Sequence, residues 1–184
     1  HHHRYVVAFT FVAAGTAMVT IVRTLLNRVR NLGIRIKLVL LDKGFYAGAV
    51  FRTLERRGLS YIVPLRLGEH HRLFHKRGSY RTTHRIEHAQ GGAYAIYAVI
   101  LRRFKRLRGG RRKVWWLGYG CGDWTQRLSF RQVMARYRLR FGIETSYRQM
   151  NQVRARTSTR SPLLRLLYIG LALILVNYYV AWKT

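Results

Sequence analysis

The first 65 residues alternate between strand-like and helix-like patterns, and no other feature constrains the fold as strongly. Apolar, β-branched and aromatic residues predict strands over residues 4–13, 34–42 and 59–65. Between them, apolar side chains recur at helical spacing over residues 14–33 and 47–58, and each helical pattern ends at a glycine. Strands that alternate with helices predict an α/β fold, with parallel members in the sheet and helices on its faces.

The next part of the chain follows other patterns. Residues 66–128 combine histidines, glycine pairs and two strand-like runs, AYAIYAVILRRF and KVWWLGYG, which predict a β-rich region with basic loops. Residues 129–156 return to a long helical pattern, with Ser129 as the expected N-cap. The chain therefore places a β-rich insertion between two parts with helical character.

The C-terminal run PLLRLLYIGLALILVNYYVAW, residues 162–182, is nearly long enough to cross a bilayer. Arg165 and Asn177 interrupt it, and no second run of this kind occurs in the sequence. We favour a buried C-terminal helix and expect no membrane contact. A basic protein with a C-terminal membrane anchor remains the alternative.

The charge of the chain indicates its partner. Lys and Arg total 35 against 6 Asp and Glu, which gives a formal net charge of +29. Such a chain favours polyanions, because each cation that meets a phosphate releases condensed counterions. Cys121 is the single cysteine, so an internal disulfide framework is excluded and a reducing, cytoplasmic setting beside the nucleoid is expected. Nucleic acid is the first expectation for a partner.

The six acids are few enough to examine one by one. Asp42 directly follows an apolar strand pattern, which is where open α/β sheets place ligands and catalytic groups; a turn cap is the alternative for it. We expect Glu55 to form an ordinary surface ion pair with neighbouring arginines. Solvated roles are expected for Glu69 and Glu87, and a structural role for Asp123.

The sixth acid, Glu144, lies in a basic helical stretch. On a regular helix, Tyr137, Arg140, Glu144, Arg148 and Asn151 fall at offsets of 0, 3, 7, 11 and 14 and share one face. That face has no aliphatic side chain, so it lines a site or faces solvent. In the second case Glu144 simply pairs with the arginines one turn away.

Asp42 and Glu144 together suggest a chemistry that neither suggests alone. An acid after a strand and an acid on a late helix, in a basic α/β chain, suit a two-metal phosphodiester site. Carboxylate oxygens hold Mg²⁺ or Mn²⁺, and the metals activate a water or a 3′-hydroxyl and stabilise the leaving oxygen. We therefore predict these two acids as catalytic residues and metal ligands.

The same residues resemble a known family. The spacing of Tyr137, Arg140 and Glu144 is similar to the first three residues of the YREK signature of DDE transposases from bacterial and archaeal insertion sequences, in the insertion-sequence-four-like group. The block LVLLDKGFYAGAVFRTLERRGLSYIVPL resembles the region around the second acid of that family. Two departures stand out. Asn151 occupies the lysine position, and no acid precedes Asp42, so we expect a C-terminal part that lacks the first catalytic aspartate and is inactive alone.

The resemblance implies a ribonuclease-H-like mixed sheet flanked by helices. Residues 1–65 and 129–184 would form the catalytic core, incomplete at its N-terminus, and residues 66–128 the β-rich basic insertion before the last catalytic helix. Asp42 would be the second acid and Glu144 the third. The implied activity is metal-dependent DNA strand cleavage and strand transfer at transposon ends.

DNA, as transposon ends and as target, is the implied partner, and we expect a dimer when the protein is bound to DNA. A non-enzymatic basic nucleic-acid-binding protein remains an alternative and predicts that the two acids lie far apart. The expected DNA-binding residues come from the signature helix and from tryptophans that could stack on a displaced base: Tyr137, Arg140, Arg148, Asn151, Arg154, Trp115 and Trp116. Trp124 is a further candidate for stacking, and core packing is the favoured role for at least two of the three tryptophans.

Overall fold

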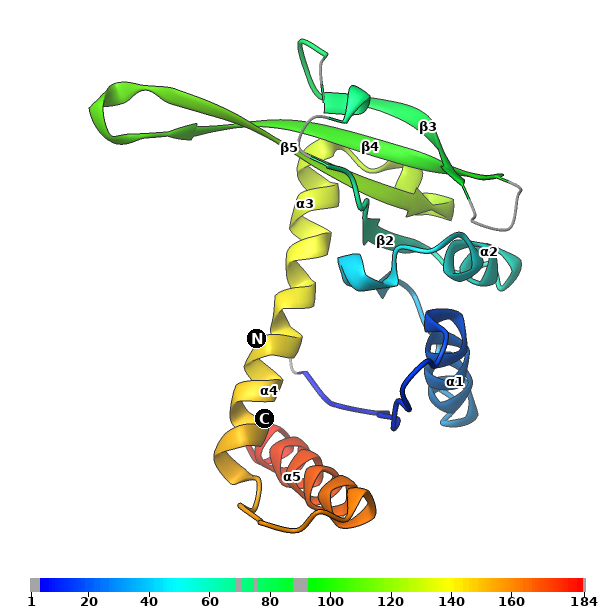
Figure 1. The fold of residues 1–184 in the computed structure, drawn as a ribbon, viewed down its shortest axis with the longest axis vertical. Coiled ribbons are helices and arrows are strands. Elements are labelled where there is room, and N and C mark those ends of the chain that lie inside the picture. Colours follow the sequence, from blue (N-terminus) through cyan, green and yellow to red (C-terminus); the bar gives the residue numbers. More distant parts are fainter. Residues whose placement is uncertain (1–3, 69–70, 75, 88–92, 184) are drawn as a thin grey trace. The chain divides into compact units, whose positions relative to one another are not determined.

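A computed structural model describes residues 4–68, 71–74, 76–87 and 93–183 (Figure 1). The chain divides into two compact units, which are described separately below. One unit comprises residues 16–138, and the other combines residues 1–15 with residues 139–184. The predicted division into a catalytic core and an insertion remains a prediction.

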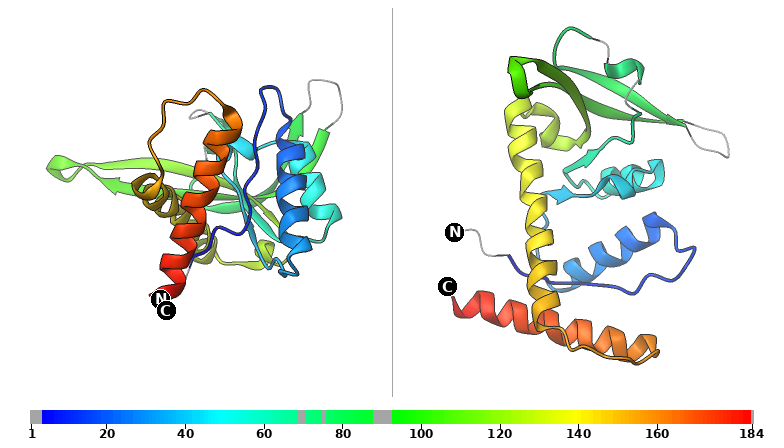
Figure 2. Two further views of the ribbon diagram at one scale, coloured as in Figure 1. Left: turned by 90° about the horizontal axis from the view of Figure 1, so that it is seen from below. Right: turned by 60° about the vertical axis from the view of Figure 1, so that its left-hand side comes forward.

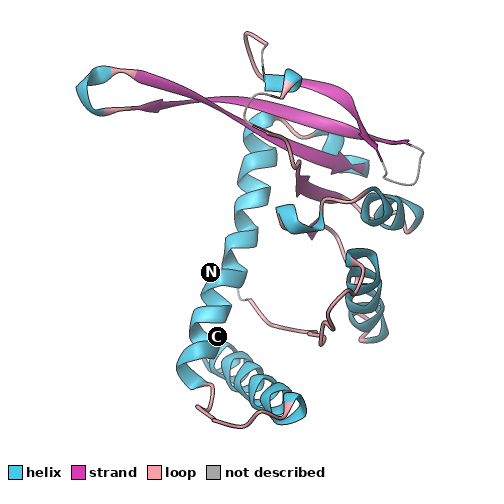
Figure 3. Cartoon of the chain, viewed as in Figure 1, coloured by secondary structure: helices cyan, strands magenta, loops and turns pink. Residues whose placement is uncertain are grey.

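The unit of residues 16–138 is built on one mixed five-stranded sheet (Figure 3). The strand order is β1 (Val39–Leu40), β2 (Tyr61–Pro64), β5 (Arg112–Gly122), β4 (Ala93–Arg106) and β3 (Tyr80–Glu87). The first pair is parallel and the other three pairs are antiparallel. The predicted α/β class with a mixed sheet is therefore confirmed, and the strands of residues 66–128 belong to the same sheet as β1 and β2.

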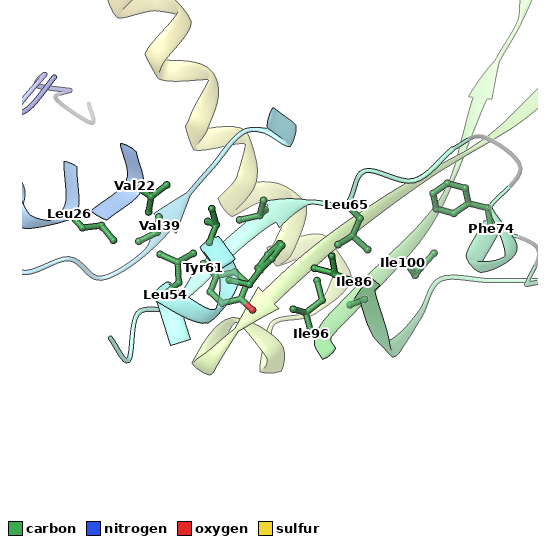
Figure 4. Close-up of a cluster of buried hydrophobic side chains, with 14 residues drawn as sticks. Val22, Leu26, Val39, Leu54, Tyr61, Leu65, Phe74, Ile86, Ile96 and Ile100 are labelled. Atoms are coloured by element: carbon green, nitrogen blue, oxygen red, sulfur yellow. The ribbon is translucent and has the colours of Figure 1, made fainter. Parts of the chain in front are cut away.

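Helices cover both faces of this sheet. On one face, α1 (Met18–Asn31) and α2 (Gly48–Arg56) lie side by side (Figures 1 and 2). They contribute apolar side chains to a buried cluster that also contains Tyr61 and Val63 of β2 (Figure 4). On the other face, α3 (Phe130–Arg138) packs against a second buried cluster. The alternation of side chains along the strands thus fills two apolar layers.

The pairing of β2 with β5 joins the part of this unit that contains α1, α2, β1 and β2 to the β-rich part that contains β3, β4 and β5. Tyr61 pairs with Gly122 in the ladder, and the Tyr61 ring is fully buried in the space that a side chain at residue 122 would need. The hydroxyl of Thr125, also fully buried, donates to the Tyr61 carbonyl at 2.8 Å or to the Gly122 carbonyl at 2.6 Å. These contacts tie a strand of the α/β half to the β-rich half.

The second unit is helical. α4 (Gly142–Val153) packs against α5 (Pro162–Trp182) through a small buried cluster that includes Met150, Leu173 and Val176. Asn177 is a polar residue within the apolar run of α5, and its side chain hydrogen-bonds to the backbone of Val6. Its Oδ1 accepts from the backbone N–H of Val6 at 2.8 Å, and its Nδ2 donates to the Val6 carbonyl at 2.6 Å. Asn177 therefore holds the N-terminal segment against α5.

The surface of α5 differs from the expected buried helix. Within the described part of the chain, α5 is the one helix long and apolar enough to span a membrane, with 21 residues and a mean hydropathy of 1.9 in its most apolar window. Only 17% of that window is buried, so the expected burial of the whole helix is not observed. Length and composition alone do not separate a membrane span from a soluble helix.

Several helices and strands also differ from the sequence prediction in their presence or in their bounds. Residues 4–13 form no strand, and the strand predicted over residues 34–42 is reduced to Val39–Leu40. β3 was not predicted. The long helix predicted over residues 129–156 is interrupted by a 3₁₀ turn at Leu139–Phe141, although its start is confirmed. There, Ser129 and Gln132 form a reciprocal capping box.

We predict that Gly122→Ala destabilises the unit of residues 16–138. The added methyl carbon would lie 2.5 Å from Cδ1 and 2.8 Å from Cζ of the fully buried Tyr61 ring. Overpacking of this kind costs about 1–3 kcal/mol. The midpoint of urea denaturation, followed by circular dichroism, should fall accordingly. Gly78→Ala is the control because nothing lies within 4 Å of that position; equal midpoints for the two variants would contradict the prediction.

Candidate functional site

Asp42 lies at the end of a parallel strand pair. The backbone N–H of Val39 donates to the carbonyl of Ser60 at 2.9 Å, which holds β1 beside β2. Asp42 then leaves the strand, and its Oδ1 accepts from the backbone N–H of Lys43 at 2.8 Å, which caps the 3₁₀ turn Lys43–Phe45. The residue is exposed. Because the cap engages one of two carboxylate oxygens, it is compatible with a role as a metal ligand.

The loop after Asp42 is anchored to the sheet. The hydroxyl of Tyr46 forms a 2.7 Å hydrogen bond with Nε2 of His84 on β3, and its ring meets the edge of Phe51. Burial raises the pKa of Tyr46 to about 12. Burial, followed by the nearby His71, lowers the pKa of His84, so a neutral imidazole is favoured there. The turn that carries Asp42 is thus fixed at both ends.

Glu144 lies on the exposed side of α4. Gly142, Ser146 and Met150 recur every four residues and form the buried side of the helix. Glu144 and Arg148 are exposed, as are Asn151 and the C-cap residue Arg154. In α4 the residues of the predicted polar face are therefore exposed to solvent.

Arg140 precedes this helix and pairs with Glu144. Its Nη2 lies 3.3 Å from Oε1 of Glu144, as expected for residues four apart. The Arg140 side chain is 17% exposed and lies over the ring of Phe141, whereas that of Glu144 is 50% exposed. The ion pair expected in the alternative interpretation is present, and about half of the carboxylate side chain still faces solvent.

Tyr137 has different surroundings. It is buried in the unit of residues 16–138, where its ring lies 5.0 Å from that of Tyr119. The 3₁₀ turn Leu139–Phe141 separates it from α4, so the count of 3.6 residues per turn does not run unbroken from Tyr137 to Glu144. A DNA contact by Tyr137 remains a prediction, and core packing is its observed contribution.

The two tryptophans predicted to contact DNA also differ from each other. Trp116 is partly buried and stacks on Phe74, with 5.9 Å between the ring centroids. Trp115, its neighbour in β5, is 44% exposed. Of the two, Trp115 has the accessible ring that base stacking requires.

The predicted acids fall in different units. Asp42 belongs to residues 16–138 and Glu144 to residues 139–184, so the structure describes the surroundings of each acid separately. Within the described residues, no three His, Cys, Asp or Glu side chains gather into a potential metal site. Asp123 has the structural role expected for it, because it accepts from the Ser60 hydroxyl at 2.7 Å, and this bond lowers its pKa. Glu69 lies outside the described residues.

The hydrogen bonds of Glu55 to two tyrosines were not predicted from the sequence. We expected a surface ion pair, but its Oε1 accepts from the Tyr61 hydroxyl at 2.6 Å and its Oε2 accepts from the Tyr94 hydroxyl. Burial, with the hydrogen bond to Glu55 second, raises the pKa of Tyr94 to about 12 and that of Tyr61 further. Tyr61 follows Glu55 by six residues but lies in the next strand, and Tyr94 lies 39 residues away, so helix periodicity alone could not reveal these contacts.

A mixed α/β sheet, a strongly basic composition and an acid after a parallel strand are together typical of α/β proteins that act on nucleic acids. The family described as the transposase DDE domain matches residues 1–178, and the chain belongs to this family. Proteins of this family are transposases that act on DNA, and they generally use divalent metal ions. No curated protein sequence matches the chain significantly.

We predict that Glu55→Ala destabilises the protein because it removes the acceptor of a hydroxyl on the fully buried Tyr61. A buried donor left without its acceptor costs about 1–3 kcal/mol. Glu55→Gln keeps an acceptor oxygen and should cost less. The measurement is the urea midpoint of the three proteins at neutral pH, and an unchanged midpoint in Glu55→Ala would contradict the assignment.

The buried phenols Tyr61 and Tyr94 should make stability fall in alkali. Burial, followed by the hydrogen bond to Glu55, raises both pKa values in the folded protein, so the contribution of the two phenols is complete below about pH 10. The contribution of Tyr94 is lost as pH rises through about 12, and that of Tyr61 at higher pH. Glu55→Gln removes the negative charge that adds to this shift, so its stability should fall less over that range. Identical pH profiles for the two proteins would show that the carboxylate does not act on the phenols.

Proposed function

We propose that this chain is the C-terminal part of a YREK-type DDE transposase of the insertion-sequence-four-like group, which cleaves DNA at transposon ends and transfers the strand. The observation that carries the proposal is the match of residues 1–178 to the transposase DDE domain. The spacing of Tyr137, Arg140 and Glu144 supports the group, and the mixed sheet supports a ribonuclease-H-like core.

In this proposal Asp42 and Glu144 are the second and third catalytic acids. Both present carboxylate oxygens at exposed positions, and hard oxygen ligands suit Mg²⁺ or Mn²⁺. The metal would supply activation of a water or 3′-hydroxyl and stabilisation of the leaving oxygen. Asp42 is held by its cap on Lys43, and Glu144 by its pairing with Arg140, so each carboxylate is oriented before substrate binds.

The cations beside Glu144 would position the DNA backbone. Arg148 and Arg154 are exposed on or directly after α4, and a guanidinium binds phosphate oxygens with two donors. Asn151 stands where the YREK signature has lysine, so the phosphate contact there would pass to its arginine neighbours. Trp115 offers an accessible ring for a displaced base.

The first acid of the family has no counterpart in residues 1–41, which contain no Asp or Glu. The proposed activity therefore requires an aspartate supplied upstream of residue 1. A non-enzymatic nucleic-acid-binding function is the second candidate, and the net charge of +29, which favours polyanions without any catalytic acid, supports it. The two functions differ in whether Asp42 and Glu144 bind the same metal ion. In the transposase, a carboxylate oxygen of each residue would lie about 2.0–2.1 Å from Mg²⁺.

We predict Mg²⁺-dependent cleavage of DNA ends by the chain when it is extended with its upstream coding sequence. Glu144→Gln and Asp42→Asn should each lower the cleavage rate by at least about 100-fold, because even outer-shell partners of metal ligands contribute 10- to 100-fold. Gel electrophoresis of labelled transposon ends measures the rate. Affinity for the same DNA should change far less, since the acids bind metal and the arginines bind phosphate.

Glu55→Gln is the matched control because it removes one carboxylate charge on α2, where the carboxylate accepts from tyrosine hydroxyls. Its cleavage rate should stay within a few-fold of the unsubstituted protein. Equal rates for the extended chain and for its Glu144→Gln variant would exclude Glu144 as a catalytic acid.

A further inference from the structure

The end of the β4–β5 hairpin forms an arm that projects from the sheet, here defined as residues 103–115 (Figures 1 and 2). Every residue of the arm is exposed, and it contains no acid. Its apolar side chains are exposed too, with Phe104 57% and Trp115 44% accessible. Seven of the thirteen residues are cations: Arg103, Lys105, Arg106, Arg108, Arg111, Arg112 and Lys113.

No third strand supports the arm within the described part of the chain. β3 pairs with β4 only as far as Ile100, and β2 pairs with β5 only from Tyr119 onward. The arm is therefore a ribbon of two strands with both faces in solvent. Isolated ribbons of this kind are marginally stable in water.

The pairing inside the arm is electrostatically unfavourable. Lys105 lies directly opposite Lys113, and Arg106 lies directly opposite Arg112. Like charges in directly opposed positions destabilise a strand pair. A folded ribbon that places its cations opposite each other needs an anion to lower this repulsion.

The base and tip of the arm are nevertheless well defined. At the base, the backbone N–H of Arg102 donates to Oγ of Ser79 at 2.9 Å, and its guanidinium lies over the rings of Phe104 and Trp116. At the tip, Gly109 and Gly110 have φ values of 79° and 77°, which side chains disfavour. The backbone positions of the opposed cations are thus set by the ladder, and only rotation of their long side chains can move the charges apart.

We infer that the arm inserts into the major groove of duplex DNA and binds the phosphates on both sides of it. The inference rests on the proposed function, in which DNA is the substrate, but concerns a surface separate from its acids. The major groove is about 12 Å wide and admits a two-stranded ribbon. Phosphates on both walls would neutralise cations from both strands, and the exposed apolar side chains would face base edges. An A-form RNA duplex, whose major groove is deep and narrow, would not admit the arm.

The charge pattern provides a test that separates binding from folding. Lys105→Glu or Lys113→Glu alone places a carboxylate opposite a lysine, so each single variant should stabilise the ribbon. The double variant restores repulsion between like charges. Amide hydrogen exchange over residues 103–115 should therefore show stronger protection in the single variants than in the unsubstituted and the doubly substituted proteins.

DNA affinity should follow a different order. Fluorescence anisotropy with a labelled DNA duplex in EDTA, which stops cleavage, should show the affinity falling from the unsubstituted protein to each single variant and then to the double variant. One lost phosphate contact weakens binding about tenfold at roughly 0.1 M salt and lowers the salt slope by about 1. Arg23→Glu is an equal charge reversal at an exposed position on α1, and it should change the DNA affinity and the salt slope less than the arm variants do.

Three results would overturn the inference. The first is an affinity order that follows ribbon stability, with the single variants binding most tightly. The second is a loss of DNA affinity in Arg23→Glu as large as in the single arm variants, which would show that only the net charge of the protein matters. The third is undiminished affinity for an RNA duplex or a single strand of the same sequence, which would exclude insertion into the DNA groove. Because the assay contains no free metal, its outcome is independent of whether Asp42 and Glu144 are catalytic.

Discussion

The pairing of Tyr61 with Gly122 is the contact on which the larger unit depends. The ring of Tyr61 fills the space of a missing side chain, its backbone carbonyl accepts from the buried Thr125, and its hydroxyl reaches Glu55 on α2. One residue therefore connects β2 to β5, to the turn after β5 and to a helix. Without this junction the parallel pair β1–β2 would be a two-stranded fragment, which is too small to bury two apolar faces.

A sheet buried on both faces determines where the charge of this chain can lie. Because α1 and α2 cover one face and α3 the other, the interior of the larger unit accepts apolar side chains, and an unpaired cation there would be costly. The cations are therefore displaced to helix surfaces and to the arm of residues 103–115, where the strands extend past their neighbours. High positive charge and a buried sheet together produce a projecting basic ribbon.

Most local elements of the fold could be predicted from sequence, although the strand expected over residues 4–13 does not form, and the non-local pairings could not. The stretch from β1 through α2 to β2 follows short-range periodicity, and the cap at Ser129 follows from residues three apart. β3 was missed because its arginines, threonines and histidine give little apolar alternation, and it forms by pairing with residues 93–100. The same limit applies to the site. Asp42 and Glu144 are exposed, and their role as metal ligands stays a prediction, whereas the burial of Tyr137 depends on a tertiary contact that the sequence does not reveal.

The ion pair between Arg140 and Glu144 bears on the role proposed for Glu144 as a metal ligand. The Arg140 guanidinium orients the Glu144 carboxylate, and under the proposed function it would compete with a metal ion for the carboxylate oxygens. Because the Glu144 side chain is half exposed, solvent screens the pair, which is worth at most about 1 kcal/mol, so a divalent ion could displace Arg140. Arg140 would then be released toward a phosphate. Under the proposed function, Arg140 would therefore hold the carboxylate in place before a metal ion binds and would join the DNA-binding residues afterwards.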